Sequence, residues 1–113
     1  MSERRIGKRW EVSLDALWDG QSGNHTARVS DLSEGGCYLD SMGDATPGEI
    51  LTLKLRLPNR DWLELTGEVA HHTPPLGFGI RFVDLTDEKL ETLRAFIEYL
   101  MDPSSDRLIK QES

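Results

Sequence analysis

The sequence predicts an all-β domain followed by one C-terminal helix, and three observations support this prediction. Apolar and polar residues alternate over several short segments, turn-forming residues separate these segments at regular spacing, and one amphipathic stretch follows them. Short strands at regular spacing are typical of an antiparallel barrel or a tight sandwich. A length of 113 residues fits one domain with one modest core.

The first three predicted strands lie on either side of two turns. Residues 10–16 alternate between apolar and polar side chains, as a half-buried strand does. Asp, Gly, Ser and Asn residues over 19–24 predict a turn or short loop. A second strand is expected over 25–30, and after the bend at 31–36 a third, short strand is expected over 37–40.

The other three predicted strands carry the strongest alternation. After the Gly-, Asp- and Pro-containing loop 41–48, leucines occupy every second position from Leu51 to Leu57. The Pro-Asn-Arg-Asp turn ends this strand, and residues 63–69 form its expected hairpin partner. A proline-containing break over 73–77 precedes the last strand, 78–82.

A helix is predicted at the C-terminal end of the domain. Thr86 has the chemistry of an N-cap, and Asp87 and Glu88 complement the helix dipole in the first turn. One apolar stripe follows at helical spacing, formed by Leu90, Leu93, Phe96, Ile97, Leu100 and Met101. Pro103 stops the helix. Because so short a helix is not stable alone in water, we expect its stripe to pack on the barrel end.

We expect residues 1–113 to form a single domain. Its parts are a basic arm over 1–9, a barrel over 10–85, a helix over 86–102 and a polar tail over 103–113. The net charge of −7 argues against a general affinity for nucleic acid or for anionic membranes.

Composition also bears on the compartment. The single cysteine, Cys37, allows no intrachain disulfide, is expected in the core, and favours a reducing compartment. The N-terminus has no apolar signal segment, and no apolar run approaches the roughly 20 residues of a membrane span. We therefore expect a cytoplasmic protein without a membrane span.

The first candidate binding motif is the arginine-rich arm. Arg4, Arg5 and Arg9 fall within six residues of one another, just before the first strand. A guanidinium makes paired hydrogen bonds to a phosphate or to the O6/N7 edge of guanine, and its plane stacks on purines. The alternative explanation is a charged, solvated N-terminal arm.

The second candidate motif is the bend that contains Asp31, Ser33 and Gly36. The Asp31 carboxylate can accept hydrogen bonds from guanine N1–H and N2–H, and the Ser33 hydroxyl can bond a base edge or a phosphate. Gly36, without a Cβ, would let a ligand approach the backbone. The alternative explanation is an ordinary Asx-turn with no ligand.

Together the two motifs resemble the signature of the PilZ domain family. Arg4-Arg5-x-x-x-Arg9 followed by Asp31-x-Ser33-x-x-Gly36 is similar to that family's RxxxR arm and [D/N]xSxxG turn. The segment 79–82, Gly-Ile-Arg-Phe, is also similar to the family's last strand. The resemblance covers nearly the whole chain and implies a six-stranded antiparallel β-barrel with a C-terminal helix.

The resemblance also implies a ligand, the bacterial second messenger cyclic di-GMP, and a receptor rather than an enzyme. By position, the arm's arginines would grip guanine edges and phosphates, and the residues of the turn would complete the site: Arg4, Arg5, Arg9, Asp31, Ser33 and Gly36. Arg4, directly before RxxxR, is the feature that goes with two stacked ligand molecules in the family. No other cofactor is expected.

Two other function classes stay open. A small nucleic-acid-binding barrel is favoured by the basic arm and disfavoured by the acidic balance. A PilZ-like adaptor that binds no nucleotide is disfavoured, because such a protein would not need both motifs to be complete. A metal site is not expected, since His71 and His72 are adjacent on a strand and face opposite sides. We expect a monomer or weak homodimer whose arm orders on binding and signals to an unknown downstream protein.

Overall fold

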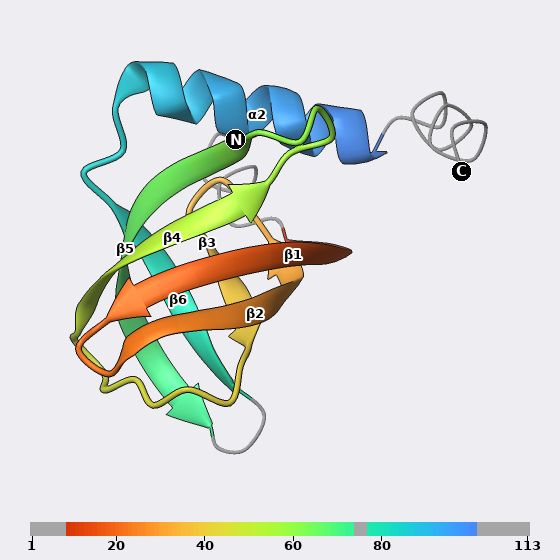
Figure 1. Ribbon diagram of the computed structural model, residues 1–113. Coiled ribbons are helices and arrows are strands. Elements are labelled where there is room, and N and C mark those ends of the chain that lie inside the picture. Colours follow the sequence, from red (N-terminus) through yellow and green to blue (C-terminus); the bar gives the residue numbers. More distant parts are fainter. Residues whose placement is uncertain (1–8, 74–76, 102–113) are drawn as a thin grey trace.

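Six antiparallel strands close into a barrel, with strand order β1-β2-β3-β6-β5-β4 (Figure 1). This computed structural model describes residues 9–73 and 77–101. The elements are β1 (Trp10–Gly20), β2 (Gly23–Leu32), β3 (Gly36–Asp40), β4 (Ile50–Arg56), β5 (Trp62–Thr73), β6 (Gly77–Val83) and α2 (Asp87–Met101). The predicted six-stranded barrel with a C-terminal helix is confirmed.

Alternation along each strand places one row of side chains inside the barrel. In β4 the inward residues Leu51, Leu53 and Leu55 are all at most 2% exposed. Leu63 and Leu65 of β5 lie opposite two of them in the antiparallel register. Because every second residue of each strand reaches the same interior, the barrel has one continuous apolar core.

Helix α2 lies across the top of the barrel and covers it (Figure 1). Its N-cap is Thr86, whose hydroxyl accepts a hydrogen bond from the backbone N–H of Lys89 at 3.2 Å. Leu93, Phe96 and Ile97 are buried in the same core cluster as the strand residues. The stripe predicted from the sequence therefore packs on the barrel end. Among the described residues no helix is long and apolar enough to cross a bilayer.

The first hairpin is tighter than the sequence suggested. The turn predicted over 19–24 is present but shorter than predicted, because β1 and β2 pair as far as Gly20 and Gly23 and leave only two residues in the turn. Gly23 adopts a φ of +108°, which a residue with a side chain rarely tolerates. The extension follows from Trp18, which is 1% exposed and fixes the end of β1 in the core.

A buried carboxylate ties this hairpin to the loop before β4. Glu49 is 7% exposed. Its side chain accepts hydrogen bonds from the backbone N–H of Gln21 at 2.7 Å and of Thr46 at 3.0 Å. Glu49 thus satisfies two donors from separate loops, which explains why an acidic residue is retained at a buried position.

Candidate functional site

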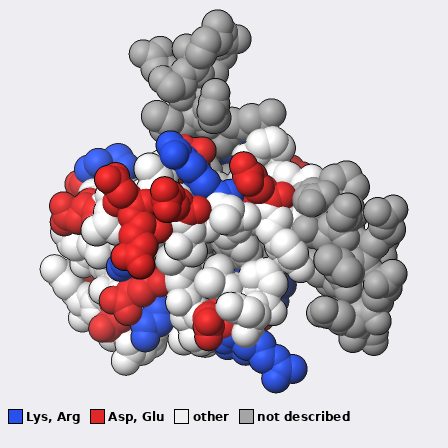
Figure 2. Space-filling model, turned by 90° about the horizontal axis from the view of Figure 1, so that it is seen from above, with Lys and Arg blue, Asp and Glu red and all other residues white. Residues whose placement is uncertain are grey.

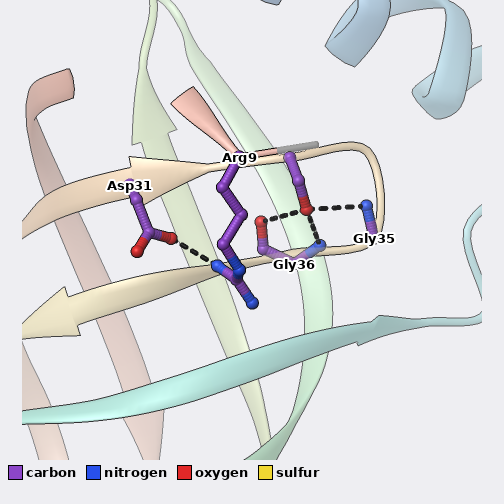
Figure 3. Close-up of polar contacts among 5 residues, drawn as sticks. Arg9, Asp31, Gly35 and Gly36 are labelled. Atoms are coloured by element: carbon purple, nitrogen blue, oxygen red, sulfur yellow. Dashed lines mark hydrogen bonds and ion pairs between the residues drawn. The ribbon is translucent and has the colours of Figure 1, made fainter. Parts of the chain in front are cut away.

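The end of the arginine arm meets the second motif on the outer surface of the barrel. Arg9 lies just before β1, and its Nη1 donates to Oδ1 of Asp31 on β2. In Figure 3 the Arg9 side chain crosses the strand pair between Asp31 and the turn at Gly35 and Gly36. The side chains of Arg9 and Asp31 are 51% and 30% exposed, so solvent reaches both. A guanidinium and a carboxylate are therefore available together on one patch.

The turn after Asp31 is held by Ser33, which is only 4% exposed. Its Oγ accepts hydrogen bonds from the backbone N–H groups of Gly35 at 3.2 Å and Gly36 at 3.1 Å. The Ser33 backbone N–H donates to the Gly36 carbonyl oxygen at 2.8 Å. This hydroxyl organises the turn from within, as the short polar residues of such turns do. The turn is therefore held by its own residues, but by the side chain of Ser33 and not by that of Asp31, as the alternative of an Asx-turn would have it.

Gly36 is required by a close approach of two strands. A Cβ at this position would lie 2.0 Å from the carbonyl oxygen of Ile80 on β6. The structure therefore gives this glycine a steric reason other than the expected space for a ligand, since its Cβ would point at β6. A second backbone contact fixes the same region, since the Phe82 N–H donates to the Gly35 carbonyl oxygen at 2.9 Å. The turn is thereby joined to β6.

Replacing Ser33 with alanine is expected to lower the free energy of unfolding by about 1–3 kcal/mol, because one buried and one part-buried N–H group lose their acceptor. Urea unfolding at neutral pH measures the loss. Ser13→Ala is the matched control, since Ser13 is exposed on β1, and its effect should stay below about 0.5 kcal/mol. Equal stability of Ser33→Ala and the wild type would show that the hydroxyl does not hold the turn.

Cys37 lies directly beneath the patch and confirms the expected core cysteine, since it is fully buried. Burial raises the pKa of its thiol well above the ordinary range, and the charge of the nearby Asp31 raises it further. The Arg9 guanidinium lowers this pKa in part. The thiol therefore stays protonated in the folded protein and is a poor nucleophile at neutral pH.

This raised pKa predicts a loss of stability in alkali. Below the ordinary thiol pKa of about 8.5 both folded and unfolded chains keep the proton, so stability is unaffected. Above it only the unfolded thiol ionises, and stability falls as the pH rises. Between pH 7.5 and 9.5 the wild type should lose stability by about 1 kcal/mol more than Cys37→Ala in urea unfolding. The same pH dependence in both proteins would contradict the prediction.

Two residues beside the site were missed by the sequence analysis. Glu34, in the turn, accepts a hydrogen bond from Nε of Arg94 on α2 at 3.2 Å, across 60 positions of sequence. Tyr38 of β3 is the register partner of Asp31. No local pattern in the sequence marks the contact between Glu34 and Arg94. The pairing of Tyr38 with Asp31 could have been found by aligning the two strands outward from the turn.

The predicted site residues are thus partly brought together. Arg9, Asp31, Ser33 and Gly36 lie on or next to one turn of the barrel surface. Arg4 and Arg5 lie outside the described residues. The arrangement offers a guanidinium for an anion or a guanine edge, and a carboxylate for N–H donors.

Fold and patch define a class, a small closed β-barrel with a helix over its top and a polar patch on its outer wall. The chain belongs to the PilZ domain family, whose sequence model matches residues 3–99. This family comprises receptor and adaptor domains, cyclic di-GMP receptors among them. No curated protein sequence matches the chain.

Solved structures of PilZ proteins share the fold at low sequence identity. The chain is similar to Escherichia coli YcgR in complex with cyclic di-GMP (TM-score 0.73, 13% identity, 91% of this chain and 48% of that one). It is also similar to the PilZ domain of that YcgR with cyclic di-GMP (TM-score 0.65, 12% identity, 93% of each chain).

A third similar structure is the Bacillus subtilis inhibitor of motility MotI/DgrA (TM-score 0.66, 19% identity, 84% of this chain and 50% of that one). The chain therefore spans about half the length of this protein and of the YcgR chain in the first of these structures. At these identities the likeness concerns the fold.

Proposed function

We propose that this chain is a receptor for cyclic di-GMP, bound at the patch formed by Arg9, Asp31 and the turn. The contact between Arg9 and Asp31 is the observation that carries the proposal, since it joins the two motifs in space. Arg4 and Arg5 are proposed to complete the grip. The domain acts by binding and not by catalysis.

The chemistry of the patch matches the ligand. A carboxylate can accept several hydrogen bonds at once, so Asp31 can hold Arg9 and the N–H donors of a guanine together. Arg4, Arg5 and Arg9 against Asp31 sum to a charge of +2, which balances the two phosphates of cyclic di-GMP. The patch is also partly open to water, so the ligand displaces solvent and not packed side chains.

The molecule's acidic character supports a selective site over a general nucleic-acid surface. Figure 2 shows Asp and Glu side chains predominating on the face that carries α2. Exposed acidic residues of this helix include Asp87, Glu88, Glu91 and Glu98. Such a surface repels a long polyanion, whereas a compact dinucleotide needs only the local positive site.

A PilZ adaptor that binds no nucleotide is the second candidate, and the structure supplies an observation in its favour. Ser33 is buried and makes its hydrogen bonds within the turn, and Asp31 is already paired with Arg9. Both motifs could therefore persist for folding alone. Binding measurements are needed to separate the two candidates.

Titration calorimetry with cyclic di-GMP, cyclic di-AMP and a single-stranded RNA tests the receptor proposal. We expect saturable binding of cyclic di-GMP alone, with a stoichiometry of one or two ligands per chain. Binding of the RNA with a steep salt dependence would favour the nucleic-acid alternative. If none of the three ligands gives a binding heat, the adaptor is favoured.

The proposed signal is a change in the arm. Ligand contacts with Arg4, Arg5 and Arg9 would order residues 4–9 against the barrel and present a new surface to a downstream protein. Amide hydrogen exchange with and without cyclic di-GMP measures this. Slower exchange across residues 4–9 is expected in the complex, and unchanged exchange there despite saturation would refute the mechanism.

A further inference from the structure

Tyr38 occupies a distinctive position beside the patch. It lies in β3 directly opposite Asp31 of β2 in the antiparallel register. Its chain neighbours Cys37 and Leu39 are both fully buried, so Tyr38 points to the outer surface, the side on which Asp31 lies. Cβ atoms of such opposed residues lie about 4.5–5.5 Å apart. The Tyr38 ring and the Asp31 carboxylate are therefore attached to neighbouring positions on the outer surface.

The next strand adds no side chain at this level. Tyr38 pairs on its other side with Gly79 of β6. Gly79 lies between Phe78 and Ile80, which both point into the core, so its missing side chain would have been on the outer surface. Across β2, β3 and β6 the outer row thus reads carboxylate, phenol ring and glycine, and Gly79 itself is buried. The guanidinium of Arg9 lies at the carboxylate end of this row.

From this arrangement we infer that Tyr38 forms a stacking subsite for a purine base at the proposed cyclic di-GMP site. A base lying on the ring directs its hydrogen-bonding edge toward Asp31, while its phosphate remains near the guanidinium of Arg9. Aromatic side chains hold bases through their faces irrespective of base identity. In this division of roles Asp31 selects guanine, and Tyr38 supplies affinity and fixes the plane of the base. The inference rests on the proposed function.

Three substitutions in the full chain separate stacking from simple burial. Tyr38→Phe keeps the ring, Tyr38→Leu keeps an apolar side chain without a π face, and Tyr38→Ala removes both. In titration calorimetry with cyclic di-GMP we expect Tyr38→Phe within about 2-fold of the wild type, and the other two variants weaker by roughly 5- to 150-fold. Thermal unfolding of each variant checks that the barrel is intact.

Trp62→Ala provides a matched control. Trp62 is also an exposed aromatic, and the Arg56 guanidinium lies 4.7 Å from its ring centroid. It belongs to β5, however, two strands from β3 in the barrel order. Its removal should leave the affinity unchanged. A loss of affinity equal to that of Tyr38→Ala would show that the effect does not depend on where the aromatic side chain lies on the barrel. That result would overturn the inference.

The outcomes distinguish this inference from the function on which it rests. If the wild type binds cyclic di-GMP and Tyr38→Leu binds as tightly as Tyr38→Phe, the stacking subsite is refuted while the receptor function stands. If the wild type does not bind, both are refuted. A nuclear Overhauser contact between the guanine H8 proton and the Tyr38 ring in the wild-type complex gives a readout that needs no variant. Its absence in a saturated complex would also count against stacking.

Discussion

Replacing Arg9 with alanine is expected to weaken cyclic di-GMP binding by roughly 10- to 150-fold, below detection in an ordinary titration if the wild-type affinity is micromolar. The estimate corresponds to a charge-assisted hydrogen bond of about 1.5–3 kcal/mol. The substitution also leaves the Asp31 carboxylate without its cationic neighbour, which adds repulsion toward the ligand phosphates. Arg5→Ala should behave in the same way, although Arg5 lies outside the described residues.

Stability should respond far less than affinity to the loss of Arg9. The Arg9–Asp31 pair is partly exposed, with 51% and 30% of the two side chains accessible, and such pairs contribute at most about 1 kcal/mol. Arg9→Lys keeps the charge without the fork and should bind with intermediate affinity. Arg28→Ala is the matched control, since Arg28 is an exposed arginine whose Nη2 lies 3.5 Å from Oδ1 of Asp15, farther along β1 and β2. Equal affinities for the Arg9→Ala and Arg28→Ala variants would exclude the proposed site.

Replacing Gly36 with alanine is expected to be the most destabilising substitution on the turn, lowering the free energy of unfolding by about 3 kcal/mol or more. The new Cβ would lie 2.0 Å from the Ile80 carbonyl oxygen and 3.3 Å from the Arg81 Cα. Both are backbone atoms, so relief requires β3 and β6 to move apart and their ladder to weaken. Denaturant unfolding gives the loss, and ligand binding should fall with it because the turn is displaced.

Gly67→Ala is the comparison that tests this reasoning. A Cβ there would lie 2.4 Å from Cγ2 of the same Ile80, a side-chain atom, and 3.5 Å from the nearest backbone atom. A side chain can shift more readily than a strand, so the destabilisation should be smaller than for Gly36→Ala. A larger effect of Gly67→Ala would mean that the close approach of β6 to the turn is not the reason for the glycine.

Local sequence patterns predicted most of the fold. Alternation with period two identified four of the six strands, the turns beside them indicated the other two, and Thr86 together with the apolar stripe identified the helix. The turn at Gln21 was predicted in the right place but too long, because Asp19 and Gly20 have turn chemistry but belong to a paired strand. Burial of Trp18 outweighed this local preference, and burial depends on tertiary structure that a single segment does not reveal.

The candidate site was predicted by residue type and spacing, and its geometry was not. Arg9 and Asp31 are 22 positions apart, and only pairing between β1 and β2 brings them into contact. Ser33 was assigned to the ligand, whereas its hydrogen bonds lie within the turn. The contacts of Glu49 with two loops and of Glu34 with Arg94 join distant segments and have no local signature.

The most direct measurement of the central claim is chemical-shift mapping of the isotope-labelled chain during titration with cyclic di-GMP. We predict saturable shifts centred on the amides of Arg9, Asp31, Gly35 and Gly36, with the hairpin at Gln21 and Ser22 unchanged. No saturable shift, or a set of shifted amides confined to strands away from this turn, would contradict the account.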